Sequence, residues 1–266
     1  MKIHHWLGAI GALLASASAH AQDRDYCPTR PGLNTTPCTI SPKRVSVETA
    51  LTDWTLEDQS DMRTDTVLFA DTIVRVGVTD TIEAQVGWSP YGHVRTRDTM
   101  SGMVDRAGRV GDVTLGFKAN LQNPDGKGLS IALLPMLTLP VGRTPVGAGD
   151  WGAALLVPVT YDLSDTLNLA MTSEIDAAVD EDGHGRHFAA SQVVGLGIKL
   201  SRQLQGTIEV QALRDEDPDG KTTQLLASPS LAWQPTDDLQ LDIGAVAGLN
   251  RSAPTVELYL GVSRRF

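Results

Sequence analysis

The sequence predicts an all-β fold: a single transmembrane antiparallel up-and-down β-barrel of about 12 strands, with short periplasmic turns and longer extracellular loops. Three observations predict it: an export signal at the start, a last strand with one apolar face, and connections that alternate in length. A soluble β-sandwich explains the alternating strands but gives no reason for the difference between long and short connections. The barrel is therefore the preferred interpretation.

The first 21 residues have the pattern of a secretory signal peptide. A weakly basic start, residues 1–5, precedes an apolar run over residues 6–17, and Ala-His-Ala at residues 19–21 forms a cleavage site. The run is shorter than the roughly 20 residues that a membrane helix needs, and no later apolar run reaches that length. We therefore expect cleavage before Gln22 and export to the bacterial outer membrane.

The net charge excludes one class of partner, and the two cysteines indicate the redox state of the compartment. A net charge of −10 argues against nucleic acid as a partner. Cys27 and Cys38 lie close together after the cleavage site, and an oxidising periplasm favours a disulfide between them over a metal pair. Residues 22–43 are then an N-terminal periplasmic extension, which is either a plain stapled tail or a partial plug at the periplasmic mouth.

Residues 44–266 are expected to form the barrel. The predicted strands cover residues 44–54, 65–78, 81–94, 111–122, 129–140, 151–163, 167–180, 188–200, 204–214, 222–234, 239–249 and 255–266. The odd-numbered connections are mostly long and rich in Asp, Gly, Arg and Pro: 55–64, 95–110, 141–150, 181–187, 215–221 and 250–254. The even-numbered connections, such as 79–80 and 164–166, are mostly tight turns. Both chain ends are therefore expected on the periplasmic side.

Each predicted strand has an apolar face for lipid and a polar face of mostly small side chains for the lumen. In the last strand Val256, Leu258 and Leu260 share the apolar face. Aromatic residues favour the membrane–water interface, so two girdles are expected. The outer girdle comprises Trp88, Trp151 and Phe188, and the inner one Tyr161, Trp233 and Phe266.

The charged residues on the lumen face are the candidates for solute contact. They are Glu83, Asp112, Lys118, Glu174, Asp176, Lys199, Glu209, Asp242 and Glu257. Acids outnumber bases among them, so an open passage would favour cations or neutral solutes. Paired charges that stabilise the barrel interior are an equally weighted alternative, because buried charges need partners or water.

Several segments resemble a known family. Residues 111–118, Gly-Asp-Val-Thr-Leu-Gly-Phe-Lys, are similar to its strand "GDVTLGLKY", and residues 133–142 to its "LLP…LPTG" segment. Residues 158–163 and 174–176 resemble its following strands, and residues 239–266 its ending "LQLDAGVNFGLTRAAPD…GLSYRF". The family is that of outer-membrane transporters assigned to the meta-pathway of phenol degradation. The resemblance covers residues 65–266 and implies a barrel that passes small, often aromatic or hydrophobic, compounds.

No catalytic, cofactor or metal site is predicted. His187 and Ser191 share a strand face, but roughly 13 Å of strand separates them, too far for a direct hydrogen bond. The Gly147, Gly149 and Gly152 motif precedes a strand, whereas a dinucleotide site follows one. Residues 215–220 begin like a calcium loop, yet its twelfth position is Leu226. A solvated acidic loop is preferred, and binding of divalent ions by the acidic outer loops stays open.

Two functions are compatible with these features. The first is a passive channel for small organic solutes; the second is a structural or interaction barrel with an occluded lumen, and an outer-membrane hydrolase is a weaker third. The expected partners are outer-membrane lipid, lipopolysaccharide, a small organic solute, and the barrel-assembly machinery through the C-terminal strand.

Overall fold

The computed structural model describes residues 23–266, so the predicted signal peptide, residues 1–21, lies outside the described part. No helix within residues 23–266 is long and apolar enough to cross a membrane. The strands are β1 (Val45–Asp58), β2 (Met62–Gly77), β3 (Ile82–Trp88), β4 (Tyr91–Asp98), β5 (Val104–Arg109), β6 (Val113–Gln122), β7 (Leu129–Leu139), β8 (Gly152–Asp162), β9 (Leu167–Val179), β10 (Arg186–Lys199), β11 (Leu204–Asp217), β12 (Gly220–Thr236), β13 (Leu239–Gly248) and β14 (Val256–Arg265).

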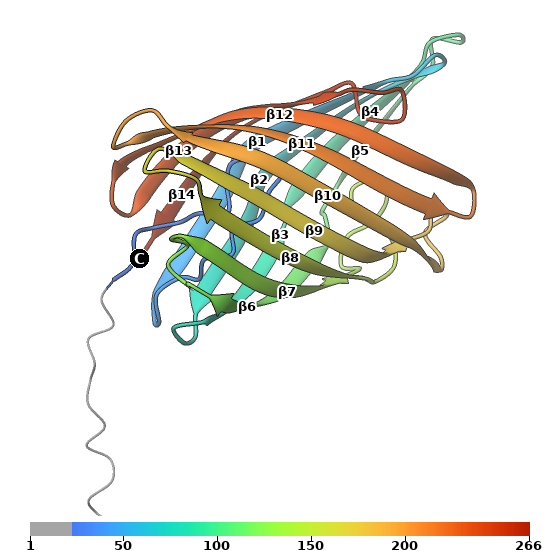
Figure 1. Ribbon diagram of the computed structural model, residues 1–266. Coiled ribbons are helices and arrows are strands. Elements are labelled where there is room, and N and C mark those ends of the chain that lie inside the picture. Colours follow the sequence, from blue (N-terminus) through green and yellow to red (C-terminus); the bar gives the residue numbers. More distant parts are fainter. Residues whose placement is uncertain (1–22) are drawn as a thin grey trace, which may run out of the picture.

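A ring of antiparallel strands closes into a barrel (Figure 1). From β6 to β14 each strand pairs with the next, β14 pairs with β1, and β1 pairs with β2. The ring is completed by β3, which joins β2 to β6. Strands β4 and β5 stand outside it, so twelve of the 14 strands form the closed wall. The predicted antiparallel barrel of about 12 strands is confirmed.

Strands β4 and β5 form a hairpin that continues the wall beyond the outer end of the barrel (Figure 1). The long strand β2 pairs with β3 through residues 72–77 and with β4 through residues 62–69. The prediction of a loop over residues 95–110 is therefore wrong for most of its length. Residues 95–109 carry several charged side chains instead of an alternating pattern, because a hairpin in water needs no apolar face, so the usual strand signal is missing.

Other outer connections are also shorter than predicted. The connection between β1 and β2 is residues 59–61 rather than 55–64, and that between β11 and β12 is residues 218–219 rather than 215–221. At the opposite end the tight turns lie close to their predicted places, and the C-terminus lies there as well (Figure 1). We call this the periplasmic end.

Side chains alternate along the strands between an exposed outer face and a buried lumen face. On β13, Leu241 and Ile243 are exposed, whereas Gln240 and Asp242 are buried. An apolar outer face is what contact with lipid requires. The six predicted girdle aromatics are all exposed on the outer surface.

The lumen face is not polar throughout, contrary to the prediction. Leu134, Leu156 and Val193 are buried and alternate with exposed neighbours on β7, β8 and β10. An inward apolar side chain with almost no exposed surface must be covered by other protein atoms rather than by lumen water. The interior at this level is therefore packed.

Candidate functional site

The N-terminal segment, residues 23–43, lies inside the periplasmic half of the barrel (Figure 1). Its backbone is hydrogen-bonded by inward side chains from strands all round the wall: Glu48 of β1, Glu83 of β3, Asn120 of β6, Thr172 of β9, Glu209 of β11 and Gln240 of β13. Since these strands surround the lumen, a segment that contacts all of them crosses it.

The start of the segment is held at the periplasmic mouth. Arg44 donates hydrogen bonds to the carboxylate of Asp23, and Arg265 lies near the same carboxylate. The bond from Arg44, assisted by Arg265, holds the pKa of Asp23 below its ordinary value. The carboxylate is therefore ionised at neutral pH, and the contact persists there.

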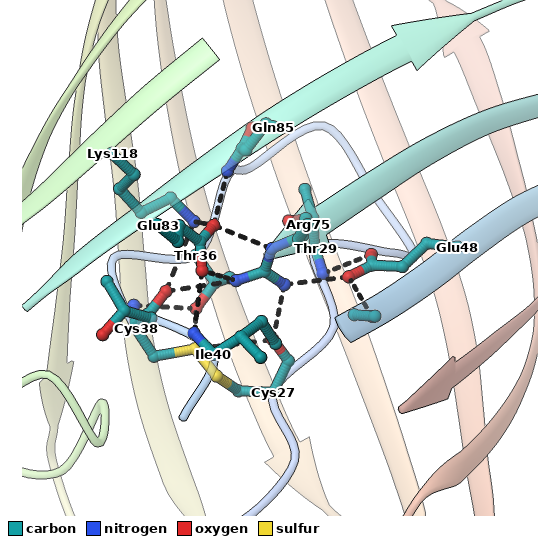
Figure 2. Close-up of polar contacts among 12 residues, drawn as sticks. Cys27, Thr29, Thr36, Cys38, Ile40, Glu48, Arg75, Glu83, Gln85 and Lys118 are labelled. Atoms are coloured by element: carbon teal, nitrogen blue, oxygen red, sulfur yellow. Dashed lines mark hydrogen bonds and ion pairs between the residues drawn. A yellow bond between two sulfur atoms is a disulfide. The ribbon is translucent and has the colours of Figure 1, made fainter. Parts of the chain in front are cut away.

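A disulfide between Cys27 and Cys38 closes the stapled loop, residues 27–38, and the predicted disulfide is thus present. Arg75 of β2 donates from Nη1 to the carbonyl of Cys27 at 2.9 Å and from Nη2 to that of Cys38 at 3.2 Å (Figure 2). Lys118 Nζ bonds the Cys38 carbonyl at 3.3 Å. Because the disulfide holds the two carbonyls close together, one guanidinium reaches both.

The base of the stapled loop rests on a buried ion network. Arg75 pairs with Glu48 at 2.8 Å and with Glu83 at 2.8 Å, and Lys118 pairs with Glu83 at 3.2 Å. All four side chains are fully buried. Two carboxylates face two cations, so the network is neutral. Other donors and acceptors of the network bond the segment, including Glu83, which accepts the amide of Ile40 (Figure 2). A dry network of this kind tolerates no missing partner.

The far side of the stapled loop reaches the opposite wall. Arg30 pairs with Asp242 of β13 at 3.0 Å. The carboxylate of Glu209 on β11 accepts the amides of Leu33 at 2.6 Å and Asn34 at 3.2 Å. The Leu33 side chain packs on the apolar cluster of Leu226, Val246 and Tyr259. An ion pair, backbone hydrogen bonds and an apolar contact therefore hold the loop in place across the lumen.

An open cavity lies on each side of the segment. The periplasmic one, about 540 Å³, is lined by residues 23–26 and by side chains that include Lys199 and Gln240. The outer one, about 380 Å³, is lined by residues 29, 30 and 32 and by lumen-facing side chains of the wall. It is acidic: Arg30 is its one lining cation, against the carboxylates Asp53, Asp71, Asp112 and Glu257, while Glu48, which also lines it, is paired with Arg75. The N-terminal segment separates the two spaces.

The predicted lumen residues divide into several groups. Glu83, Lys118, Glu209 and Asp242 hold the N-terminal segment. Asp112 lies at the outer end, where its carboxylate accepts the amides of Gly142 and Ala148 and so ties down the loop between β7 and β8. Glu257 lines the outer cavity and Lys199 the periplasmic one. Glu174 accepts a hydrogen bond from Ser191, and Asp176 is half-buried on the same strand.

The central residues of this site were not singled out from the sequence. Arg75 lies between Val74 and Val76, so a lone cation in an apolar alternating strand was the available signal. Glu48 lies in a similar position between Val47 and Thr49. Arg30 carried no signal, because it belongs to an irregular segment whose path is decided by the fold.

Comparison with solved structures finds similar folds at low sequence identity. The transport unit of the autotransporter AIDA-I from Escherichia coli has a TM-score of 0.53 at 9% identity, covering 84% of this chain and 90% of that one. The NanC porin has a TM-score of 0.51 at 10% identity, covering 83% and 98%. The translocator domain of the autotransporter NalP from Neisseria meningitidis has a TM-score of 0.50 at 14% identity, covering 84% and 88%. These similarities concern the fold alone.

No curated protein matches the chain. A family model does match, over residues 29–266, and its description is "Putative MetA-pathway of phenol degradation". The match covers the barrel and most of the N-terminal segment. It agrees with the resemblance carried by the motifs at residues 111–118 and 239–266. The chain therefore belongs to the family described as the MetA-pathway of phenol degradation, and its fold is that of the outer-membrane β-barrels.

Proposed function

We propose that the protein is a passive channel of the bacterial outer membrane for small organic solutes, gated by its own N-terminal segment. The observation that carries the proposal is the position of that segment. It crosses a closed barrel and has an open cavity on either side, about 380 Å³ and about 540 Å³. Movement of one short, stapled segment would join the two spaces into a passage.

The charges around the cavities favour one class of solute. Carboxylates outnumber cations around the outer cavity. An anion would meet repulsion there, whereas a neutral or cationic molecule would not. The family description names phenol degradation, which favours small aromatic solutes. The proposed solutes are therefore small neutral or cationic aromatic compounds.

The exterior supports the expected location. The outer face of the wall is apolar and exposed, with aromatic residues at both rims, as contact with outer-membrane lipid and lipopolysaccharide requires. The C-terminal strand β14 closes the ring against β1, so recognition of that strand by the barrel-assembly machinery is part of the proposal. Residues 1–21 would serve as the export signal and be removed.

A structural barrel with a permanently occluded lumen is the second candidate. The fully buried network around Arg75 favours it, because such contacts hold the segment firmly in place. The two candidates differ in one respect. A gated channel opens at some measurable frequency, whereas an occluded barrel does not.

The test is single-channel recording of the refolded chain from Gln22 onward in a planar bilayer, with and without phenol. The comparison is a variant that lacks residues 22–43. Openings of the unmodified chain, blocked by millimolar phenol and selective for cations, would support the gated channel. A folded barrel that conducts only after the deletion would favour the occluded barrel. Anion selectivity would contradict the proposed solute class, and a deleted barrel that folds but never conducts would contradict the gating role.

A further inference from the structure

We propose that the outer rim carries a site for a divalent transition-metal ion such as Zn²⁺, formed by Asp180, His187 Nδ1 and Asp217, with Asp215 orienting the imidazole. This outer-rim cluster brings together residues from two hairpins. Asp180 follows β9 and His187 lies at the start of β10, whereas Asp215 and Asp217 lie at the end of β11. The site is separate from the N-terminal segment and from both lumen cavities.

The imidazole of His187 is enclosed by carboxylates on both sides. Nδ1 lies 2.9 Å from Asp180 Oδ1 and 3.3 Å from Asp217 Oδ2, and Nε2 lies 3.1 Å from Asp215 Oδ1. The side chain is only 6% exposed. A neutral imidazole has one N–H, so its other nitrogen would direct a lone pair at a carboxylate oxygen. A second proton removes that repulsion, and so does a metal ion held between Nδ1 and the two carboxylates.

The second nitrogen supports the same assignment. Nε2 is buried and makes no hydrogen bond, although Asp215 lies within reach and the ring is directed into the cluster. A histidine that binds a metal through one nitrogen usually donates its other N–H to a carboxylate, which fixes the ring. A small rotation of His187 on metal binding would align Nε2–H with Asp215. All four side chains then have a role.

The separation of the ligand atoms fits a single small ion. One ligand atom from each of Asp180, His187 and Asp217 lies within 4.8 Å of the others. Zinc bonds of about 2.1 Å in tetrahedral geometry place ligand atoms roughly 3.4 Å apart. The observed 2.9 Å and 3.3 Å from Nδ1 need only small adjustments to reach this spacing. Water would complete the coordination.

The local charge also favours a cation. Three carboxylates surround one imidazole, so the outer-rim cluster is negative whether or not that imidazole is protonated. The mixture of imidazole and carboxylate ligands suits zinc and its neighbours better than calcium, which prefers oxygen alone. Glu181 already donates its amide to Asp217 at 2.8 Å, so the two hairpins touch without the ion. The bound ion would lock this contact.

The test is zinc binding to the folded, chelator-treated chain from Gln22 onward, measured by calorimetry, with X-ray absorption at the zinc edge to identify nitrogen ligands. The variants are His187→Gln and Asp217→Asn. The matched control is Asp182→Asn, which removes an exposed acid from the same loop. Heat-modifiable migration on a gel verifies folding, and Asp180→Asn replaces any variant that fails to fold.

We expect one Zn²⁺ per chain with an imidazole ligand, at least tenfold weaker binding by both cluster variants, and unchanged binding by the control. Absence of binding at millimolar zinc would overturn the proposal. Binding that His187→Gln leaves unchanged would also overturn it, since only the acidity of the loops would then be involved. Equal affinity for calcium and zinc in the unmodified chain would overturn it as well, because the carboxylates alone would then account for binding.

Discussion

Replacing Arg75 by methionine tests whether the buried ion network holds the N-terminal segment in the lumen. Methionine fills much of the same space but leaves Glu48 and Glu83 with Lys118 as their only cation. It also removes the hydrogen bonds that Arg75 donates to the carbonyls of Cys27 and Cys38, of which only the second keeps a donor, Lys118. When the segment is in place the network is dry, so the excess negative charge is costly. When the segment leaves, water enters and solvates both carboxylates. The substitution therefore destabilises the closed state relative to the open state.

The size of the effect follows from the burial of the network. Removing one partner of a fully buried ion pair costs about 3–5 kcal/mol. We expect the equilibrium between the closed and open states to shift by roughly two to three and a half orders of magnitude, at 1.4 kcal/mol per tenfold. Exposed pairs contribute about 0–1 kcal/mol, so Arg95→Met, which breaks a half-exposed contact with Asp65, is the matched control.

Two measurements would detect the shift. Hydrogen exchange should be accelerated at the amide of Ile40, which bonds Glu83 at 2.8 Å, and single-channel recordings should show longer open times. Arg75→Lys should give a smaller effect, because an ammonium keeps the charge but cannot reach both carbonyls. The reasoning is refuted if folded Arg75→Met keeps the exchange rate and the conductance of the unmodified chain.

Three further changes test other parts of the structure. Glu209→Gln weakens the acceptor that lies 2.6 Å from the amide of Leu33, so exchange there should rise by the equivalent of about 1–3 kcal/mol; an unchanged rate would show that this bond contributes little. Reducing the disulfide between Cys27 and Cys38 should loosen the stapled loop by about 2–4 kcal/mol and raise the opening frequency, whereas an unaltered frequency would mean that the wall contacts suffice. Ile243→Arg places a charge on the exposed outer face of β13 and should lower the free energy of unfolding by about 2–4 kcal/mol, the cost of an arginine at the bilayer midplane. An unchanged midpoint of urea unfolding in lipid vesicles would contradict the assignment of Ile243 to the lipid face.

The sequence determined the wall of the barrel. Strands that face lipid on one side and the lumen on the other need a period of two, so the alternation in residues 111–122 and 239–249 was readable without any contact information. The runs separated by turn residues gave an even number of wall strands, and an even number places both chain ends at the same end of the barrel, as the structure shows. Where the hairpin of β4 and β5 leaves the lipid, this constraint ends, and the prediction failed there.

Only the tertiary structure decided what lies inside the wall. Residues 23–43 have no periodic pattern, because their backbone is hydrogen-bonded by side chains of the barrel strands, some of them far along the chain, as with Leu33 and Glu209. The partners of Arg75 come from neighbouring strands: Glu48 from β1 and Glu83 from β3. Lys118 joins them because β3 pairs with β6 and so skips the hairpin of β4 and β5, which the sequence does not indicate. His187 is a polar loop residue by sequence, yet the pairing of β10 with β11 brings it between three carboxylates. Alternation is a local property of a strand, whereas partners across a lumen exist only once the barrel has closed.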